Sequence, residues 1–264
     1  MRAIADMISS LVTHRHFVFG NAWAEMRNRY AGTILGILWH AVQPISLILL
    51  FSFVFTELMS ARGAGSNNYS IYIISGILPW LAFADCLTRC TTSLTDNANF
   101  IRKVALAEFL YVARAAVVAG ILMMLSLLAV MIASIILGMR PTLAWLSIPA
   151  VGLLFILFGF GLGLMLAPFH VFLRDTGQAT AMVLQFWMWL SPVILLEEIM
   201  PAGLRYAQNF NPAAYFIRAL RDPLVNGTVT GMHNWLIMIM LVFGSVWIGQ
   251  RLMQLTRSDI RDAL

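Results

Sequence analysis

Two charged side chains and two thiols between residues 85 and 90 are the first candidates for chemistry in this chain. Asp85 and Arg89 are four residues apart, as are Cys86 and Cys90, so a helix places the members of each pair on one face. Ionisable groups inside a membrane span are costly and often functional, but the Asp85–Arg89 spacing favours an ion pair within one helix. The thiols have no histidine or further cysteine nearby, so we expect two small apolar side chains rather than a metal or redox site.

No other combination of residues predicts catalysis, a metal or a cofactor in this chain. The five histidines are scattered, and neither a Ser/His/Asp set nor a pair of carboxylates stands out. The phosphate-binding motif G-x-x-x-x-G-K-[ST] is absent, and the only lysine, Lys103, lacks the glycines of that motif. Gly159, Gly161 and Gly163 form a G-x-G-x-G run without a preceding strand, which indicates close helix packing. If ATP drives this protein, another chain must bind it.

The composition is that of a membrane protein. Hydrophobic residues make up 60% of the 264 residues, charged residues make up 11%, and the mean hydropathy is +0.82. A soluble domain of this length needs more charge to cover its surface. The net charge of +5 fits loops that face anionic lipid better than it fits nucleic acid. Charged residues interrupt the N-terminal region, so no cleaved signal peptide is expected.

The apolar runs predict an all-α membrane protein in which residues 1–264 form a single transmembrane domain. A hydrocarbon core about 30 Å thick is crossed by roughly 20 helical residues. Six spans are expected, at about 37–56, 70–94, 115–138, within 141–173, 176–196 and 233–250. Spans one to five thus occupy 34–196, and span six with a cytoplasmic tail occupies 233–264. Twelve of the 17 cationic residues then fall on the side of the two termini, which predicts that both termini are cytoplasmic.

Two connecting regions are unusual. Residues 197–232 are half apolar and contain three prolines, which predicts two short interfacial or re-entrant helices. Residues 1–33 predict an amphipathic helix in the cytoplasmic interface, which serves either as a membrane anchor or as a platform for a partner. Its apolar stripe comprises Val12, Phe19, Trp23, Met26 and Tyr30, and its polar side comprises Arg15, Asn21, Glu25 and Asn28.

The connector between spans two and three is predicted to expose Phe100 and Ile101, flanked by amides and cations. It contains Asn97, Asn99, Phe100, Ile101, Arg102 and Lys103. This pattern suits a short helix that inserts into a groove of a soluble partner, and the alternative is a solvated, positively charged loop. Aromatic residues are abundant in the spans. Most are expected to face lipid, but a subset that lines a conduit could stack on sugar rings, with Tyr72, Trp80, Phe83, Trp187 and Trp189 as candidates.

Several short motifs, taken in order, resemble the type-2 ABC exporter permeases that export O-antigen and capsular polysaccharides. They are the run from Arg29 to Trp39 followed by Gln43-Pro44, Leu78-Pro79-Trp80, Asn97 to Lys103, Arg174-Asp175, Ser191 to Ile194, and Asn211-Pro212. The resemblance covers nearly the whole chain. One departure is the lack of proline in 104–110, where members of the family often carry it.

The resemblance implies a homodimer of permeases in the bacterial inner membrane, bound to two ATPase subunits that carry ATP and magnesium. A lipid-linked polysaccharide would pass through a channel between the two copies. Residues Asn97 to Lys103 would form the coupling helix. The interface helix would place Glu25, Arg27 and Arg29 near the ATPase, and periplasmic gate helices in 197–232 would carry Arg205, Asn211, Pro212 and Arg218.

Two other functions compete with this interpretation. An ABC permease for teichoic-acid-type polymers, lipids or drugs would share most of these features. An ion-coupled secondary transporter would instead need acidic residues at midspan and inverted repeats. Asp85 is the only carboxylate well inside a predicted span, and no repeat stands out. A membrane-embedded enzyme is disfavoured because no catalytic combination emerges.

Overall fold

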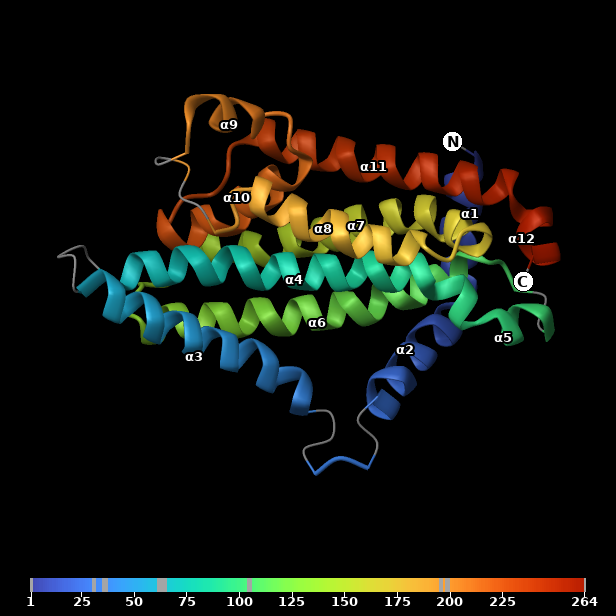
Figure 1. Cartoon of the computed structure of the whole chain (residues 1–264), viewed down its shortest axis with the longest axis horizontal. Coiled ribbons are helices and arrows are strands. Elements are labelled where there is room, and N and C mark those ends of the chain that lie inside the picture. Colours follow the sequence, from blue (N-terminus) through green and yellow to red (C-terminus); the bar gives the residue numbers. More distant parts are fainter. Residues whose placement is uncertain are drawn as a thin grey trace.

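The computed structural model describes residues 2–29, 32–34, 38–60, 66–103, 106–194, 197 and 200–263. Every regular element within these residues is a helix (Figure 1). In chain order the helices are α1 Arg2–Thr13, α2 Arg15–Arg29, α3 Trp39–Ser60, α4 Ser66–Asp96, α5 Ala98–Lys103, α6 Phe109–Ile136, a 3₁₀ turn at Leu143–Leu146, α7 Ser147–Phe172, α8 Thr176–Leu190, α9 Ala202–Ala207, α10 Pro212–Val225, α11 Met232–Leu255 and α12 Arg257–Ala263.

Four helical segments are long and apolar enough to cross a membrane. They are Ser70–Asp96, Phe109–Ile136, Leu143–Phe172 and Met232–Leu255, and they correspond to the predicted spans two, three, four and six. In lipid, a helix is favoured over an irregular chain because it satisfies every backbone donor and acceptor internally. The helix α3 has 22 residues, and the described apolar stretch within it is Val42–Phe51.

The predicted fifth span, 176–196, is longer than the helix that forms there. The helix α8 ends at Leu190 and has 15 residues, which corresponds to about 22 Å at 1.5 Å per residue. Pro192 restricts the residue before it, and Ser191 is accordingly extended, with φ −101° and ψ 159°. Residues 191–194 form a turn in place of the predicted last helical turns. The total of six spans therefore stays a prediction.

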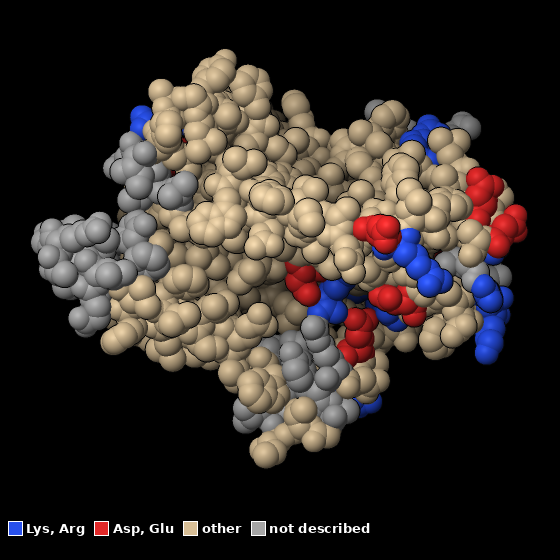
Figure 2. Space-filling model, in the orientation of Figure 1, with Lys and Arg blue, Asp and Glu red and all other residues tan. Residues whose placement is uncertain are grey.

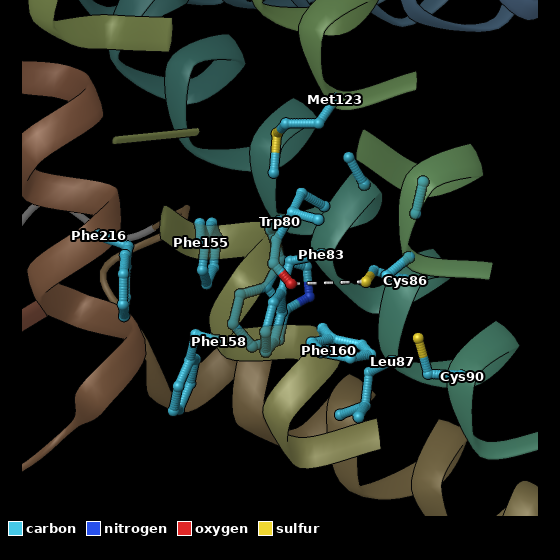
Figure 3. Packing of buried hydrophobic residues seen from close by; sticks show 14 of the residues in the cluster. Trp80, Phe83, Cys86, Leu87, Cys90, Met123, Phe155, Phe158, Phe160 and Phe216 are labelled. Carbon is cyan, nitrogen blue, oxygen red and sulfur yellow. Dashed lines mark hydrogen bonds between the residues drawn. The ribbon is translucent and has the colours of Figure 1, made fainter. Parts of the chain in front are cut away.

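The helices α4, α6, α7 and α11 run along the length of the bundle, and α7 packs against the other three (Figure 1). Aromatic rings fill the centre of the bundle (Figure 3). The ring of Phe83 on α4 stacks on that of Phe155 on α7 at a centroid distance of 4.3 Å. Phe216 of α10 stacks on the other side of Phe155 at 4.9 Å, so α10 contributes to the same core.

The glycines of α7 allow close approach to α4 and α11, as predicted. A Cβ atom at Gly163 would overlap Cys90 on α4, and a Cβ atom at Gly161 would overlap Ser245 on α11. Both cysteines are free and buried, and the Cys86 thiol donates to the Ile156 carbonyl at 3.8 Å (Figure 3). The interpretation of the thiols as small apolar side chains on one helix face fits this packing.

The predicted N-terminal helix is two helices, and its apolar stripe is divided between two environments. Val18, Ala22 and Met26 are buried against α6, each one turn from the next. Phe19 and Trp23, which belonged to the predicted stripe, are 61% and 55% exposed. The exposure of Phe19 and Trp23 fits a helix whose aromatic side chains lie in the membrane interface, which stays a prediction, whereas Met26 of the same stripe is buried in contact with α6. Tyr30, also predicted in the stripe, lies outside the described residues.

Both chain ends lie at the end of the bundle that carries α5, and α9 lies toward the opposite end (Figure 1). The region 200–232 contains two short helices, α9 and α10, as the prolines predict. The two regions with predicted functions, around α5 and around α9–α10, are thus far apart.

Candidate functional site

The short helix α5 is attached to the bundle by Asn97 and Ile101. The Asn97 side chain donates to the Ser93 carbonyl at 2.7 Å, and the Asn97 carbonyl accepts from the backbone N–H groups of Phe100 and Ile101. Ile101 is buried, so its predicted exposure was wrong. The other predicted residues of this segment face outward, because Phe100 is 63% exposed and Asn99, Arg102 and Lys103 are exposed as well. An exposed aromatic ring beside two cations on a fixed helix suits a docking contact.

Acidic and basic side chains gather over the half of the molecule that carries α2, α5 and α12 (Figure 2). The most connected of them is Glu25 of α2, whose carboxylate lies 3.3 Å from Arg89 of α4 and 3.2 Å from Arg114 of α6. Arg89 also contacts Asp85 at 2.6 Å, which confirms the ion pair predicted within this helix. Glu25 therefore ties α2 to the two helices that flank α5.

The three residues predicted to lie near an ATPase have different surroundings. Glu25 faces the membrane helices through the contacts above, and Arg27 is exposed. Arg29 ends α2, and its side chain lies outside the described part of the chain. The role of these residues in ATPase contact stays a prediction.

Glu108, which the sequence did not single out, anchors the C-terminal helix. Its side chain is 3% exposed and lies 3.1 Å from Arg257 and 2.5 Å from Arg261, both on α12. Arg261 also donates to the Leu106 carbonyl at 3.4 Å. The spacing of four residues between the two arginines was the one available signal, because Glu108 lies about 150 residues away in the sequence. The C-terminal helix is thereby fixed to the chain that leaves α5.

Of the five candidates for lining a conduit, three have rings that meet one another in the core of the bundle. Trp80 and Phe83 are buried in the core, and Trp187 meets both rings edge to face at 5.6 and 5.9 Å. Trp189 is 54% exposed on α8, and Tyr72 is half-buried on α4. The conduit role of all five stays a prediction.

A groove of about 370 Å³ lies between α4 and α8. Its wall is mostly apolar, with the carboxylate of Asp85 among its few polar groups, and it is lined by Trp80, Leu81, Ala84, Asp85, Thr88, Ala181, Leu184, Gln185 and Met188. Trp80 is the one conduit candidate that lines it. Among the described residues, no three His, Cys, Asp or Glu side chains come together as metal ligands.

Asn211 is the centre of a hydrogen-bond network at the start of α10. Its Oδ1 accepts from the Ala213 N–H at 3.1 Å and from the Trp187 indole at 2.9 Å. Its Nδ2 donates to Ser191 at 2.8 Å and to Gln208 at 3.0 Å. Asn211 is thus the N-cap of α10, and Pro212 occupies the first helical position, where its missing N–H costs nothing.

Two arginines of the same region bind one short segment. Arg218 of α10 makes a bidentate ion pair with Glu197, with distances of 2.7 and 2.9 Å. Arg205 of α9 donates to the Glu197 carbonyl at 2.9 Å. Three of the four predicted gate residues, Arg205, Asn211 and Arg218, therefore hold the chain between α8 and α10 in place, and Pro212 begins α10. Their role as a gate is a separate matter and stays a prediction.

Comparison with known proteins identifies the class of this one. A family model described as "ABC-2 type transporter" matches residues 17–225, well over half of the chain. The chain therefore belongs to the ABC-2 type transporter family, and the resemblance predicted from the motifs is confirmed.

Individual relatives within this family are export permeases. The chain is 24% identical over 206 residues to an O-antigen export system permease protein of Klebsiella pneumoniae, a match that covers 78% of each chain. It is 24% identical over 188 residues to an O-antigen export system permease protein of Myxococcus xanthus, covering 71% of each. It is 20% identical over 244 residues to a capsule polysaccharide export inner-membrane protein of Neisseria meningitidis, covering 89% of each.

Proposed function

We propose that this chain is the permease subunit of an ATP-driven ABC exporter that moves a lipid-linked polysaccharide, of O-antigen or capsular type, from the cytoplasm to the periplasm. Membership of the ABC-2 family and the export permeases among its relatives support this function. The observation in the structure that carries it is α5, a short helix between two long membrane helices, on which Phe100 is exposed.

In this proposal two copies of the chain bind two ATPase subunits, which supply ATP and magnesium. Phe100 enters a cleft of the ATPase, with Arg102 and Lys103 beside it. Closure of the ATPase dimer pushes on α5, and the displacement reaches α4 and α6 directly because they flank α5 in the chain. It reaches α2 through Glu25, which contacts Arg89 and Arg114.

The proposed topology has six spans and cytoplasmic termini in the inner membrane. The helix α3 supplies the first span, and α8 with the turn after it supplies the fifth. A helix of about 22 Å does not cross a hydrocarbon core of about 30 Å alone. The chain after Leu190 therefore completes the crossing, shielded from lipid by α9 and α10. The position of α5 beside both termini supports this orientation, because the ATPases are cytoplasmic.

Deletion of the gene tests the function directly. Loss of surface polysaccharide together with lipid-linked glycan accumulating in the cytoplasm is expected, and the wild-type gene should reverse both effects. Normal surface polysaccharide in the deletion strain contradicts the proposal. To separate an ATP-driven exporter from an ion-coupled one, export is measured in inverted membrane vesicles. We expect it to require ATP and to persist when a protonophore removes the proton gradient.

A further inference from the structure

A buried arginine at the end of the bundle opposite α5 contacts three separate elements. Arg221 of α10 is 5% exposed. The carbon of its guanidinium lies 3.4 Å from the centre of the Tyr72 ring on α4. Its Nη2 donates to the Val193 carbonyl at 3.2 Å, in the turn that follows α8. One side chain therefore joins α10, α4 and the 191–194 turn.

The guanidinium of Arg221 is stabilised by the Tyr72 ring and the Val193 carbonyl. No carboxylate lies within ion-pair distance of it among the described residues, and its Nε has no hydrogen-bond partner there. Burial lowers the pKa of Arg221 to about 10, so the group remains protonated at neutral pH. A desolvated guanidinium gains most from the face of an aromatic ring, because no water competes for the charge. The contact with Tyr72 is accordingly a large part of what keeps Arg221 in place.

The close approach of Arg221 and Val193 to α4 depends on the lack of a side chain at Gly76. A Cβ atom at Gly76 would lie 2.5 Å from the Val193 oxygen and 2.7 Å from Nη2 of Arg221. Any larger residue would push the turn and the guanidinium away from α4. The absence of a side chain at Gly76 thus allows the 191–194 turn to lie directly against α4.

The turn and Glu197 beyond it are bound by residues of α10 and its N-cap at three points. Asn211 binds Ser191, Arg218 binds Glu197, and Arg221 binds Val193. Arg221 differs from the other two because it also reaches α4, which continues into α5. We propose that Arg221, Tyr72 and Gly76 form a latch that holds the 191–194 turn against α4 and so keeps the exit of the permease closed. This inference rests on the proposed transport function.

As a positioning residue, Arg221 is expected to affect the closed state rather than substrate contact. Movement of α4 during the ATPase cycle slides the Tyr72 ring from under the guanidinium, which frees the turn. Permanent loss of the latch should leave the exit partly open at rest. The measurable consequence is leakage of small solutes through the resting complex.

The latch is tested with the complete exporter, permease plus ATPase, in liposomes that contain carboxyfluorescein, without ATP. Arg221→Met and Tyr72→Leu should each raise dye leakage about tenfold, because each removes a desolvated cation–π contact. The double variant should leak no more than either single variant, because the two substitutions remove the same Arg221–Tyr72 contact. Gly76→Ala should also leak, although it changes no charge. Tyr72→Phe keeps the ring face and should leak much less than Tyr72→Leu, and Arg140→Met, which alters an exposed arginine, should leak like the wild type.

Two results overturn the latch. One is wild-type leakage in both Arg221→Met and Tyr72→Leu. The other is equal leakage in Tyr72→Phe and Tyr72→Leu, which would show that the ring face is not what holds Arg221. If Arg221→Met fails to assemble with the ATPase, the comparison of the two Tyr72 variants decides the question. The leakage assay needs neither glycan nor hydrolysis, so a failure of the proposed export function in the deletion strain remains distinguishable from a failure of the latch.

Discussion

The cationic side chains of α5 and those of α10, at opposite ends of the helix bundle, have opposite environments. At the end that carries α5, Arg102 and Lys103 are exposed beside the exposed ring of Phe100. At the other end, Arg218 is paired with Glu197, and Arg221 is buried against Tyr72. Exposed groups are available to a second molecule, whereas groups satisfied within the chain fix its own conformation. The exposed cations of α5 are therefore expected to serve docking, whereas the arginines of α10 restrain the chain itself.

The contrast between exposed and buried side chains also occurs within α5, where Phe100 is exposed and the adjacent Ile101 is buried. Phe100→Asp should lower export by more than about tenfold, because an exposed aromatic anchor is the kind of residue that dominates an interface. ATP hydrolysis should continue without export, and insertion of the chain into the membrane should be normal. The measurements are surface polysaccharide, ATP hydrolysis by the complex and the amount of chain in the membrane fraction.

Ile101→Asp is the matched control. It places a carboxylate at a position that is 5% exposed, so it should reduce the amount of folded chain rather than the coupling. If Phe100→Asp leaves export unchanged, the docking role of α5 is wrong. If both variants merely reduce the amount of chain, Phe100 is part of the fold and the comparison between the two ends fails.

A second test concerns Glu108, the buried charge at the α5 end. The double variant Arg257→Ala/Arg261→Ala leaves the Glu108 carboxylate buried without its two ion-pair partners and should lower the free energy of unfolding by about 3 kcal/mol or more. Glu108→Ala should cost less, because it leaves two arginines that are 54% and 41% exposed to solvent. Unfolding in mixed micelles of rising SDS content measures both. A larger loss in Glu108→Ala would show that solvent does not reach the arginines.

The sequence predicted those parts of the fold that depend on local composition. Apolar runs long enough to cross a membrane predicted four helices that the structure contains, because a helix is the conformation that satisfies the backbone in lipid. The Asp85–Arg89 pair and the close helix packing at the glycines of α7 also follow from short-range spacing. The exposure of Phe100 and the burial of Ile101 on α5 required the structure, since both residues are apolar and adjacent.

Contacts between residues far apart in the sequence could not be predicted from the spacing of residues along one helix. Glu25 and Arg89 are 64 residues apart, and Glu108 and Arg261 are 153 residues apart. The packing of Ala22 and Met26 of α2 against α6 could not be predicted for the same reason, since periodicity identifies apolar positions without naming their neighbour. The shortened α8 reflects a local signal, Ser191-Pro192, that was outweighed by the apolar residues after it.

Substitutions of Asn211 test how much its hydrogen bonds stabilise the region around the start of α10. Asn211→Ala removes the N-cap of α10 and the bonds to Trp187, Ser191 and Gln208, and should lower the free energy of unfolding by about 2 kcal/mol. Asn211→Asp keeps the acceptor for the N-cap but loses the two donated bonds, and should cost about half as much. The same SDS titration measures both. If both variants lose the same free energy of unfolding, the stabilisation comes from the bonds that Asn211 donates to Ser191 and Gln208 alone.

The smallest expected effect on stability belongs to the exposed cations of α5. Arg102→Gln and Lys103→Gln should each change the free energy of unfolding by no more than about 0.5 kcal/mol, because substitutions of solvated side chains rarely do more. Their expected effect is on the partner. The ATPase retained by the purified permease should decrease, and its sensitivity to salt should weaken, because rim charges steer association through electrostatic attraction. Tyr206→Ala alters a side chain that is 67% exposed near the opposite end and should leave the retained ATPase unchanged. Equal retention in all three variants would mean that the exposed cations at the α5 end do not serve docking, and burial of Phe100 alone would have to hold the ATPase.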